Sequence, residues 1–110
     1  MNPTLDKSTS THHVVPEDKL RCGPLRVEPG GGGINVSRAI RKLNGSSHLL
    51  YLSGGLTGQA LGHLLREEQL QEQPIPIEEP TRESFTVLEE ASTNQYRFTM
   101  PGPEVSQREW

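Results

Sequence analysis

The sequence predicts an α/β fold built around a layered sheet, followed by a β-hairpin. Two glycine-rich loops, at 30–33 and 54–58, each run directly into an amphipathic helical pattern. A short and nearly continuous apolar run at 48–53 lies between these patterns, as buried parallel strands do in α/β sheets. The segment 84–100 contains two β-rich runs around a turn, and this arrangement indicates a hairpin.

The composition limits both the core and the class of partner. The chain has 110 residues, of which 31% are hydrophobic and 5% aromatic, so the core that it can build alone is thin. The net charge of −3 gives no indication of nucleic acid or an anionic membrane as a partner. The single cysteine excludes an intrachain disulfide and a cysteine-based metal cluster. Because neither a membrane span nor a signal-peptide core is present in the sequence, we expect a cytoplasmic protein.

The first part of the chain predicts exposed strands. Met1 to Asp6 is short and polar, while Thr9 to Val15 is rich in β-branched residues and indicates an exposed strand. Leu20 to Glu28 alternates, but Gly23-Pro24 interrupts the alternation, so we expect an edge strand or a ribbon. Its candidate inward-facing residues are Leu20, Cys22, Leu25 and Val27.

The four glycines from Gly30 to Gly33 are incompatible with a strand or a helix interior, because ordering them costs too much entropy. They indicate a loop where the backbone approaches a ligand, and the alternative is a flexible linker. A helix follows, with its C-cap signal at Asn44-Gly45 and its apolar stripe at Val36, Ala39, Ile40 and Leu43. Free N–H groups and the positive dipole end at its start would accept an anion or a hydroxyl-rich ligand. Asn35 could bind sugar hydroxyls or cap the helix.

The second half predicts a strand at His48–Ser53 and a helix from about Gln59 to Gln69 that Pro74 and Pro76 end. The apolar face of this helix comprises Leu61, Leu64, Leu65 and Leu70. The hairpin strands are expected at Ser84–Glu89 and Gln95–Met100. Glu104 to Trp110 would begin a further helix, which indicates that the chain is a piece of a longer protein.

Single side chains leave several interpretations open. The glycines lack the lysine of a P-loop, and no dinucleotide-binding glycine pattern follows a strand. His12 and His13 would point to opposite faces of a strand, which makes a poor metal pair. Arg82 and Arg97 could bind a phosphate group or could simply be solvated.

The run from Glu28 to Ala39 resembles the first signature of the PfkB carbohydrate kinases. Five further segments resemble the minor 6-phosphofructokinase branch of bacteria in the same order, namely Asn2–Asp6, Pro16–Cys22, Gly54–Gly58, Thr81-Arg82 and Gln95–Pro103. The resemblance covers essentially the whole chain and implies a ribokinase-like fold, an α/β layered sheet with a small β-lid. It implies that 1–110 is the N-terminal fragment of one kinase domain, with lid strands in 8–28 and 81–100 and an α/β core in 29–80.

The resemblance also implies a function and a set of site residues. The full-length protein would transfer the γ-phosphoryl group of ATP to the 1-hydroxyl of fructose 6-phosphate with the help of Mg²⁺. The sugar hydroxyls would be held by Asp6, Gly30, Gly31 and Asn35. Arg82 and Arg97 would approach the same substrate or its phosphate. Glu17 and Lys19 lie on the lid and would reach the neighbouring subunit's site in a homodimer formed by interlocking lids.

The departures from the family pattern define what the chain is expected to lack. The second family signature, a Gly-Ala-Gly-Asp loop with the catalytic aspartate, does not occur in the sequence. We therefore expect no catalytic residue, no metal site and no nucleotide site in this chain. The alternatives are a 1-phosphofructokinase, a tagatose-6-phosphate kinase, or a non-catalytic remnant that pairs through its lid.

Overall fold

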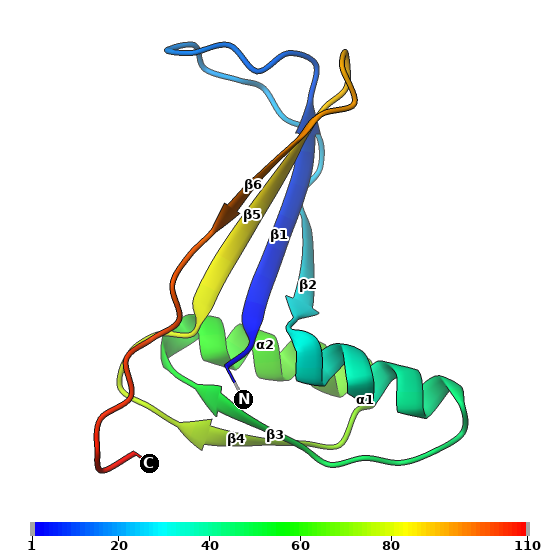
Figure 1. The fold of residues 1–110 in the computed structure, drawn as a ribbon, viewed down its shortest axis with the longest axis vertical. Helices are drawn as coiled ribbons and strands as arrows, with labels where there is room; N and C mark the ends of the chain where they lie inside the picture. Colours follow the sequence, from blue (N-terminus) through cyan, green and yellow to red (C-terminus); the bar gives the residue numbers. More distant parts are fainter. Residues whose placement is uncertain (1, 110) are drawn as a thin grey trace.

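The computed structural model describes residues 2–109 and consists of an upright sheet standing on a base of two helices and two strands (Figure 1). The elements in chain order are β1 (Thr4–Thr11), β2 (Arg26–Gly30), α1 (Gly32–Lys42), β3 (Leu49–Ser53), α2 (Gly55–Glu67), β4 (Glu72–Pro76), β5 (Arg82–Glu89) and β6 (Gln95–Thr99). The core lies between the base and the end of the upright sheet nearest to it. It contains Leu5, Ile34, Leu49, Tyr51, Leu61, Leu65 and Leu70. Within residues 2–109, no helix has the length and apolarity needed to cross a membrane.

The upright sheet has the strand order β2-β1-β5-β6. The predicted hairpin is confirmed, since β5 and β6 pair antiparallel around a connection at 90–94. The parallel pairing of β1 with β5 was not predicted, and it aligns Thr4 with Arg82 and Asp6 with Ser84. This pairing brings the start of the chain beside its last third.

The prediction for the first strand was wrong in its bounds. The strand runs over Thr4–Thr11, not Thr9–Val15, and its ends Thr4 and Thr11 are buried. The physical reason is the length of its partner, because β5 ends at Glu89, which pairs with Thr11. Met1, which belonged to the predicted polar segment, lies outside the described residues.

The glycine segment is divided between two elements, contrary to the predicted loop. Gly30 ends β2, while Gly32 and Gly33 form the first turn of α1. Only Gly31 has a positive φ, of 123°, and a Cβ atom there would meet the Pro3 backbone at 3.4 Å. The strand before it is an edge strand as predicted, but it covers only Arg26–Gly30. Of its four predicted inward residues, only Val27 packs against the core, and Leu20, Cys22 and Leu25 are exposed.

The buried face of α1 is not the predicted apolar stripe. Ile34 and Ser37 face the core, whereas Val36 is 58% and Leu43 is 83% exposed. The predicted C-cap is confirmed, because Asn44 has a φ of 60° and the Gly45 N–H donates to the Ile40 carbonyl at 2.9 Å. Periodicity located the helix, but the packing partners decided which side is covered.

The base contains one helix and one strand whose predictions need correction. The predicted apolar face of α2 is confirmed, but the helix begins at Gly55 rather than near Gln59. Pro74 and Pro76 lie in β4, a strand that was not predicted, which pairs parallel with β3. Proline is tolerated there because each of the two strands is an edge strand. The expected helix after Glu104 is not formed up to Glu109, and Trp110 lies outside the described residues.

Candidate functional site

A polar cavity of about 280 Å³, here called the sheet cavity, lies where β1, β5 and β6 approach the start of α1. Chain segments far apart in the sequence contribute to it through the β1–β5 pairing. Its chemically most useful lining residues are Asp6, Gly31, Arg82, Ser84, Arg97 and Thr99. The site therefore combines one carboxylate, two guanidinium groups and several hydroxyls.

Asp6 enters the cavity from β1, and Gly30 on the neighbouring strand β2 leaves room for its carboxylate. A Cβ atom added at Gly30 would overlap the Asp6 carboxylate and lie 2.6 Å from its Cγ atom. Since β1 and β2 are paired, with Thr4 opposite Gly30, this fit is a property of the strand ladder. The sequence alone indicated that the backbone approaches a ligand at the glycines. At Gly30, the structure shows that the Asp6 carboxylate occupies the space that a Cβ atom would need.

The two arginines come from neighbouring strands. Arg82 starts β5, and its Nη1 atom donates to the Met100 carbonyl at 3.2 Å. Its Nε atom is buried and has no hydrogen-bond partner among residues 2–109. Arg97 lies opposite Thr86 in the β5–β6 ladder, on the face opposite to that of Tyr96 and Phe98. A buried donor without a partner is costly, so Arg82 is well suited to receive an anionic ligand.

The start of α1 adds backbone donors to the site. Gly31 lines the cavity and is the N-cap residue of α1, where no side chain forms a capping hydrogen bond. The first turn contains no acidic residue. Its N–H groups and the positive end of the helix dipole therefore remain available for an anion or a hydroxyl group.

Four expected site residues do not line the cavity, namely Gly30, which borders Asp6, and Asn35, Glu17 and Lys19. Asn35 lies in the first turn of α1, and its Oδ1 atom accepts a hydrogen bond from Arg38 Nη1 at 3.2 Å. Glu17 and Lys19 are exposed in the connection 12–25, at the end of the upright sheet that lies furthest from the helices (Figure 1). Within one chain, the structure does not bring these two side chains to the sheet cavity.

Sequence reasoning missed some lining residues and one supporting pair. Ser84 and Thr99 are opposite each other in the β5–β6 ladder and share a face with Arg97, which the period-two pattern could have indicated. The pair formed by Arg38 and Glu68 joins α1 to the end of α2, and no local pattern indicates a contact across that distance.

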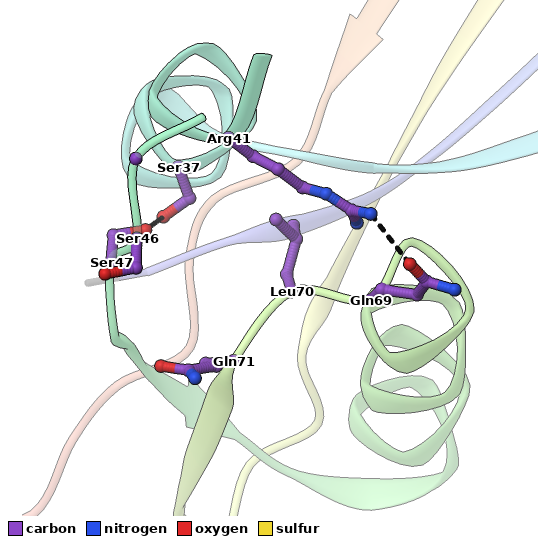
Figure 2. A pocket seen from close by; sticks show the side chains of 8 residues that line it. Ser37, Arg41, Ser46, Ser47, Gln69, Leu70 and Gln71 are labelled. Atoms are coloured by element: carbon purple, nitrogen blue, oxygen red, sulfur yellow. Dashed lines mark hydrogen bonds between the residues drawn. The ribbon is translucent and has the colours of Figure 1, made fainter. Parts of the chain in front are cut away.

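A second hollow, of about 190 Å³, lies between the ends of α1 and α2 (Figure 2). Arg41 there donates from Nη2 to Gln69 Oε1 at 2.7 Å and from Nη1 to the Glu68 carbonyl. Ser47 Oγ donates to Ser37 Oγ at 3.1 Å. These polar groups already form hydrogen bonds with one another. Those bonds connect the ends of the two helices and leave few polar groups in the hollow to bind a ligand.

Metal-binding side chains do not gather in the described part of the chain, where no group of three His, Cys, Asp or Glu side chains could hold an ion. His12 and His13 follow the end of β1. Their rings lie edge to face, with a distance of 4.3 Å between the ring centroids. The expectation that a strand would separate them is therefore wrong, because the strand ends at Thr11.

Comparison with known proteins assigns the family. Residues 3–110 match the model of the pfkB family carbohydrate kinase. The chain belongs to the pfkB family of carbohydrate kinases. This pfkB-family chain is 49% identical to ATP-dependent 6-phosphofructokinase isozyme 2 of Mycobacterium tuberculosis (strain H37Rv) over 106 aligned residues. The alignment covers 96% of this chain and 31% of that protein.

Two further relatives extend the comparison. The crystal structure of phosphofructokinase-2 from Escherichia coli in complex with fructose-6-phosphate matches this pfkB-family chain with a TM-score of 0.91 and 44% identity, over 99% of the chain and 36% of that structure. The 1-phosphofructokinase of Bacillus subtilis is 41% identical over 77 residues, covering 64% of this chain and 23% of that protein. The expected ribokinase-like α/β fold is thereby confirmed. The chain spans about a third of the length of its 6-phosphofructokinase relatives.

Proposed function

We propose that this pfkB-family chain is the N-terminal, sugar-binding part of an ATP-dependent 6-phosphofructokinase. The whole protein would transfer the γ-phosphoryl group of ATP to the 1-hydroxyl of fructose 6-phosphate, with Mg²⁺, in the cytoplasm. The observation that carries this proposal is the sheet cavity, in which the carboxylate of Asp6 and the guanidinium groups of Arg82 and Arg97 share one polar space. A sugar phosphate requires both kinds of group, since its hydroxyls bind acceptors and its phosphate binds arginine forks.

Each lining group has a role in this proposal. Asp6 accepts hydrogen bonds from sugar hydroxyls, with Gly30 leaving it room, and the start of α1 at Gly31 donates backbone hydrogen bonds. Arg82 and Arg97 form charge-assisted bonds to the phosphate group. Phosphoryl transfer depends mainly on positioning the reactants and on stabilising charge. A rigid sugar site would supply the positioning of the phosphoryl acceptor.

The other half would come from chain beyond these residues. We propose that the catalytic base, the nucleotide site and the Mg²⁺ site belong to that part, so the 110-residue chain alone should not turn over. The exposed apolar stripe of α1, which includes Val36 and Leu43, supports a larger assembly because a further layer would bury it.

We further propose a homodimer formed through the upright sheet, acting as a lid. Phe85, Tyr96 and Phe98 lie on the sheet face opposite to that of Arg97, and Phe98 is 52% exposed. An exposed apolar sheet face gains stability by pairing with a second one. In such a dimer, Glu17 and Lys19 would extend to the partner's sheet cavity.

A chimera tests the proposed function. In this protein, called the chimera below, residues 1–110 replace the aligned N-terminal part of the Escherichia coli phosphofructokinase-2. We expect ADP formation that depends on fructose 6-phosphate, with lower kcat/KM for fructose 1-phosphate and tagatose 6-phosphate. Loss of activity in a folded chimera, or preference for another sugar phosphate, would contradict the proposal, and the unmodified Escherichia coli enzyme is the control.

A second candidate is a non-catalytic module that pairs through the same sheet face, and the exposure of Phe85, Tyr96 and Phe98 on that face favours it. The DNA that follows the codon for Trp110 separates the two. A continuing reading frame with a Gly-Ala-Gly-Asp loop supports the kinase, and a stop codon supports the module.

A further inference from the structure

Arg38 of α1 bonds to three separate segments around the glycines. Its Nη2 atom donates to the Pro29 carbonyl at 2.8 Å, and its Nη1 atom donates to Asn35 Oδ1 at 3.2 Å. Its Nε and Nη2 atoms donate to the two carboxylate oxygens of Glu68, at 2.7 and 2.8 Å. One side chain thus connects the end of β2, the first turn of α1 and the C-cap of α2.

The Arg38–Glu68 pair is held more firmly than an ordinary surface ion pair. It is bidentate, and the two side chains are only 27% and 37% exposed. The hydrogen bond from Arg38 holds the pKa of Glu68 below its ordinary value, and the same bond raises the pKa of Arg38. Glu68 therefore fixes the plane of the guanidinium group, and this plane determines where the remaining N–H groups point.

The contact with Asn35 also determines which half of its amide is left for a ligand. A guanidinium group has only donors, so it can bond only to the oxygen of the Asn35 amide. The NH₂ group of Asn35, which is exposed in the first turn of α1 next to the cavity residue Gly31, is then left to donate to an oxygen of a ligand that extends past Gly31. The contact with Pro29 meanwhile fixes the peptide group that leads into Gly30 and Gly31, next to the sheet cavity.

We infer that Arg38 is a positioning residue for sugar-phosphate binding, which holds the glycine segment and turns the Asn35 amide to its donor side, with Glu68 holding Arg38. This inference deepens the proposed function and rests on it for the identity of the ligand. Arg38 does not touch the sugar phosphate itself in this arrangement. Lysine cannot replace it, because an ammonium group carries its three N–H donors on one nitrogen and lacks the planar fork of five donors that reaches three separate acceptors.

Arg41 provides a matched control within the same helix. It also bonds to the end of α2, at the Glu68 carbonyl and at Gln69 Oε1, but its hydrogen bonds do not involve Pro29 or Asn35. If these arginines only join the two helices, the variants Arg38→Lys and Arg41→Lys should behave alike. If Arg38 positions the site, only its variant should affect sugar binding.

The kinetic test uses both variants in the chimera. We expect Arg38→Lys to raise KM for fructose 6-phosphate about tenfold, the equivalent of one charge-assisted hydrogen bond, with KM for ATP and kcat little changed. Arg41→Lys should leave all three parameters unchanged. Equal effects of the two variants on KM would overturn the inference. An inactive but folded unsubstituted chimera would instead contradict the proposed function.

A second measurement does not depend on activity. The backbone N–H of Asn35 donates to the Gly31 carbonyl at 3.1 Å, so its hydrogen exchange reports on the order of this segment. In the chimera, hydrogen exchange at Asn35 should be faster in Arg38→Lys than in Arg41→Lys. The same exchange rate in both variants would overturn the inference whether or not the chimera is active.

Discussion

Asp6 occupies the space that a side chain at Gly30 would need, because a Cβ atom at residue 30 would lie 2.6 Å from the Asp6 Cγ atom. The two residues belong to adjacent strands of one antiparallel pair. A glycine at residue 30 is therefore a condition for the position of the Asp6 carboxylate, and not a source of flexibility.

The first prediction compares two glycines of the same run. In the chimera, Gly30→Ala should displace Asp6 and raise KM for fructose 6-phosphate by about one decade or more, as the loss of a charge-assisted hydrogen bond does. A Cβ atom at Gly32 would meet nothing within 4 Å, so Gly32→Ala should leave KM unchanged. Steady-state kinetics measures both, and equal KM values for the two variants would show that Asp6 does not bind the sugar.

The second prediction concerns Arg97. Because its side chain lines the sheet cavity, Arg97→Ala in the chimera should cost about 1.5–3 kcal/mol of substrate binding, or one to two decades in KM for fructose 6-phosphate. KM for ATP should change little. Arg26, which is exposed and paired with Glu28 on β2, provides the control, since Arg26→Ala should leave both constants unchanged. Small and equal changes for both substrates would indicate that Arg97 is a solvated strand residue.

The third prediction separates charge from geometry at Arg82. Arg82→Lys keeps the positive charge but removes the buried Nε–H group that has no partner among residues 2–109. We expect KM for fructose 6-phosphate to rise while the free energy of unfolding, measured in urea, falls by less than about 1 kcal/mol, because an unsatisfied donor is also removed. A large loss of stability with unchanged KM would assign Arg82 a structural role instead.

The fourth prediction is a pH dependence that arises from Glu68. Its folded-state pKa is lowered, chiefly by the hydrogen bond from Arg38, so its contribution to stability is present above its ordinary pKa and is lost as the pH falls through the folded value. Glu68→Gln should therefore be less stable than the unsubstituted chain at pH 7. The difference should shrink in acid, below the ordinary glutamate pKa of about 4.3. Urea unfolding at pH 7 and in acid measures the difference in free energy of unfolding between the two proteins. A difference that is the same at both pH values would contradict the Arg38–Glu68 pair.

The fifth prediction concerns the base of the molecule. Tyr51 is buried, and its hydroxyl donates to Glu72 Oε2 at 2.6 Å, while Arg66 contacts the other oxygen of the same carboxylate at 3.1 Å. Tyr51→Phe leaves a largely buried carboxylate oxygen without this donor and should cost about 1–3 kcal/mol of stability. Tyr96→Phe, on an exposed strand, should change stability by less than about 0.5 kcal/mol. Equal stabilities of the two variants would contradict this role of the Tyr51 hydroxyl.

Part of the candidate site could be predicted from the sequence, because it depends on local chemistry. The glycines before an amphipathic helix indicated a helix N-terminus open to a ligand, and Gly31 lines the cavity there. Period-two alternation placed Arg97 opposite to Tyr96 and Phe98. The link from Arg38 to Glu68 was not predicted, because it joins the first turns of one helix to the end of another.

By itself, the sequence determined the elements with strong local signals, namely the strand β3, of which only Leu49 and Tyr51 are buried, the helix α2 with its leucine face, the cap at Asn44 and the β5–β6 hairpin. Only the tertiary structure decided how they combine. It paired β1 with β5, which sets Asp6 beside Ser84, placed two prolines in the edge strand β4, and buried Ile34 and Ser37 rather than the apolar stripe of α1. The physical reason is that turns and periodicity act between near neighbours in the chain, whereas strand partners and buried faces depend on surfaces contributed by distant segments.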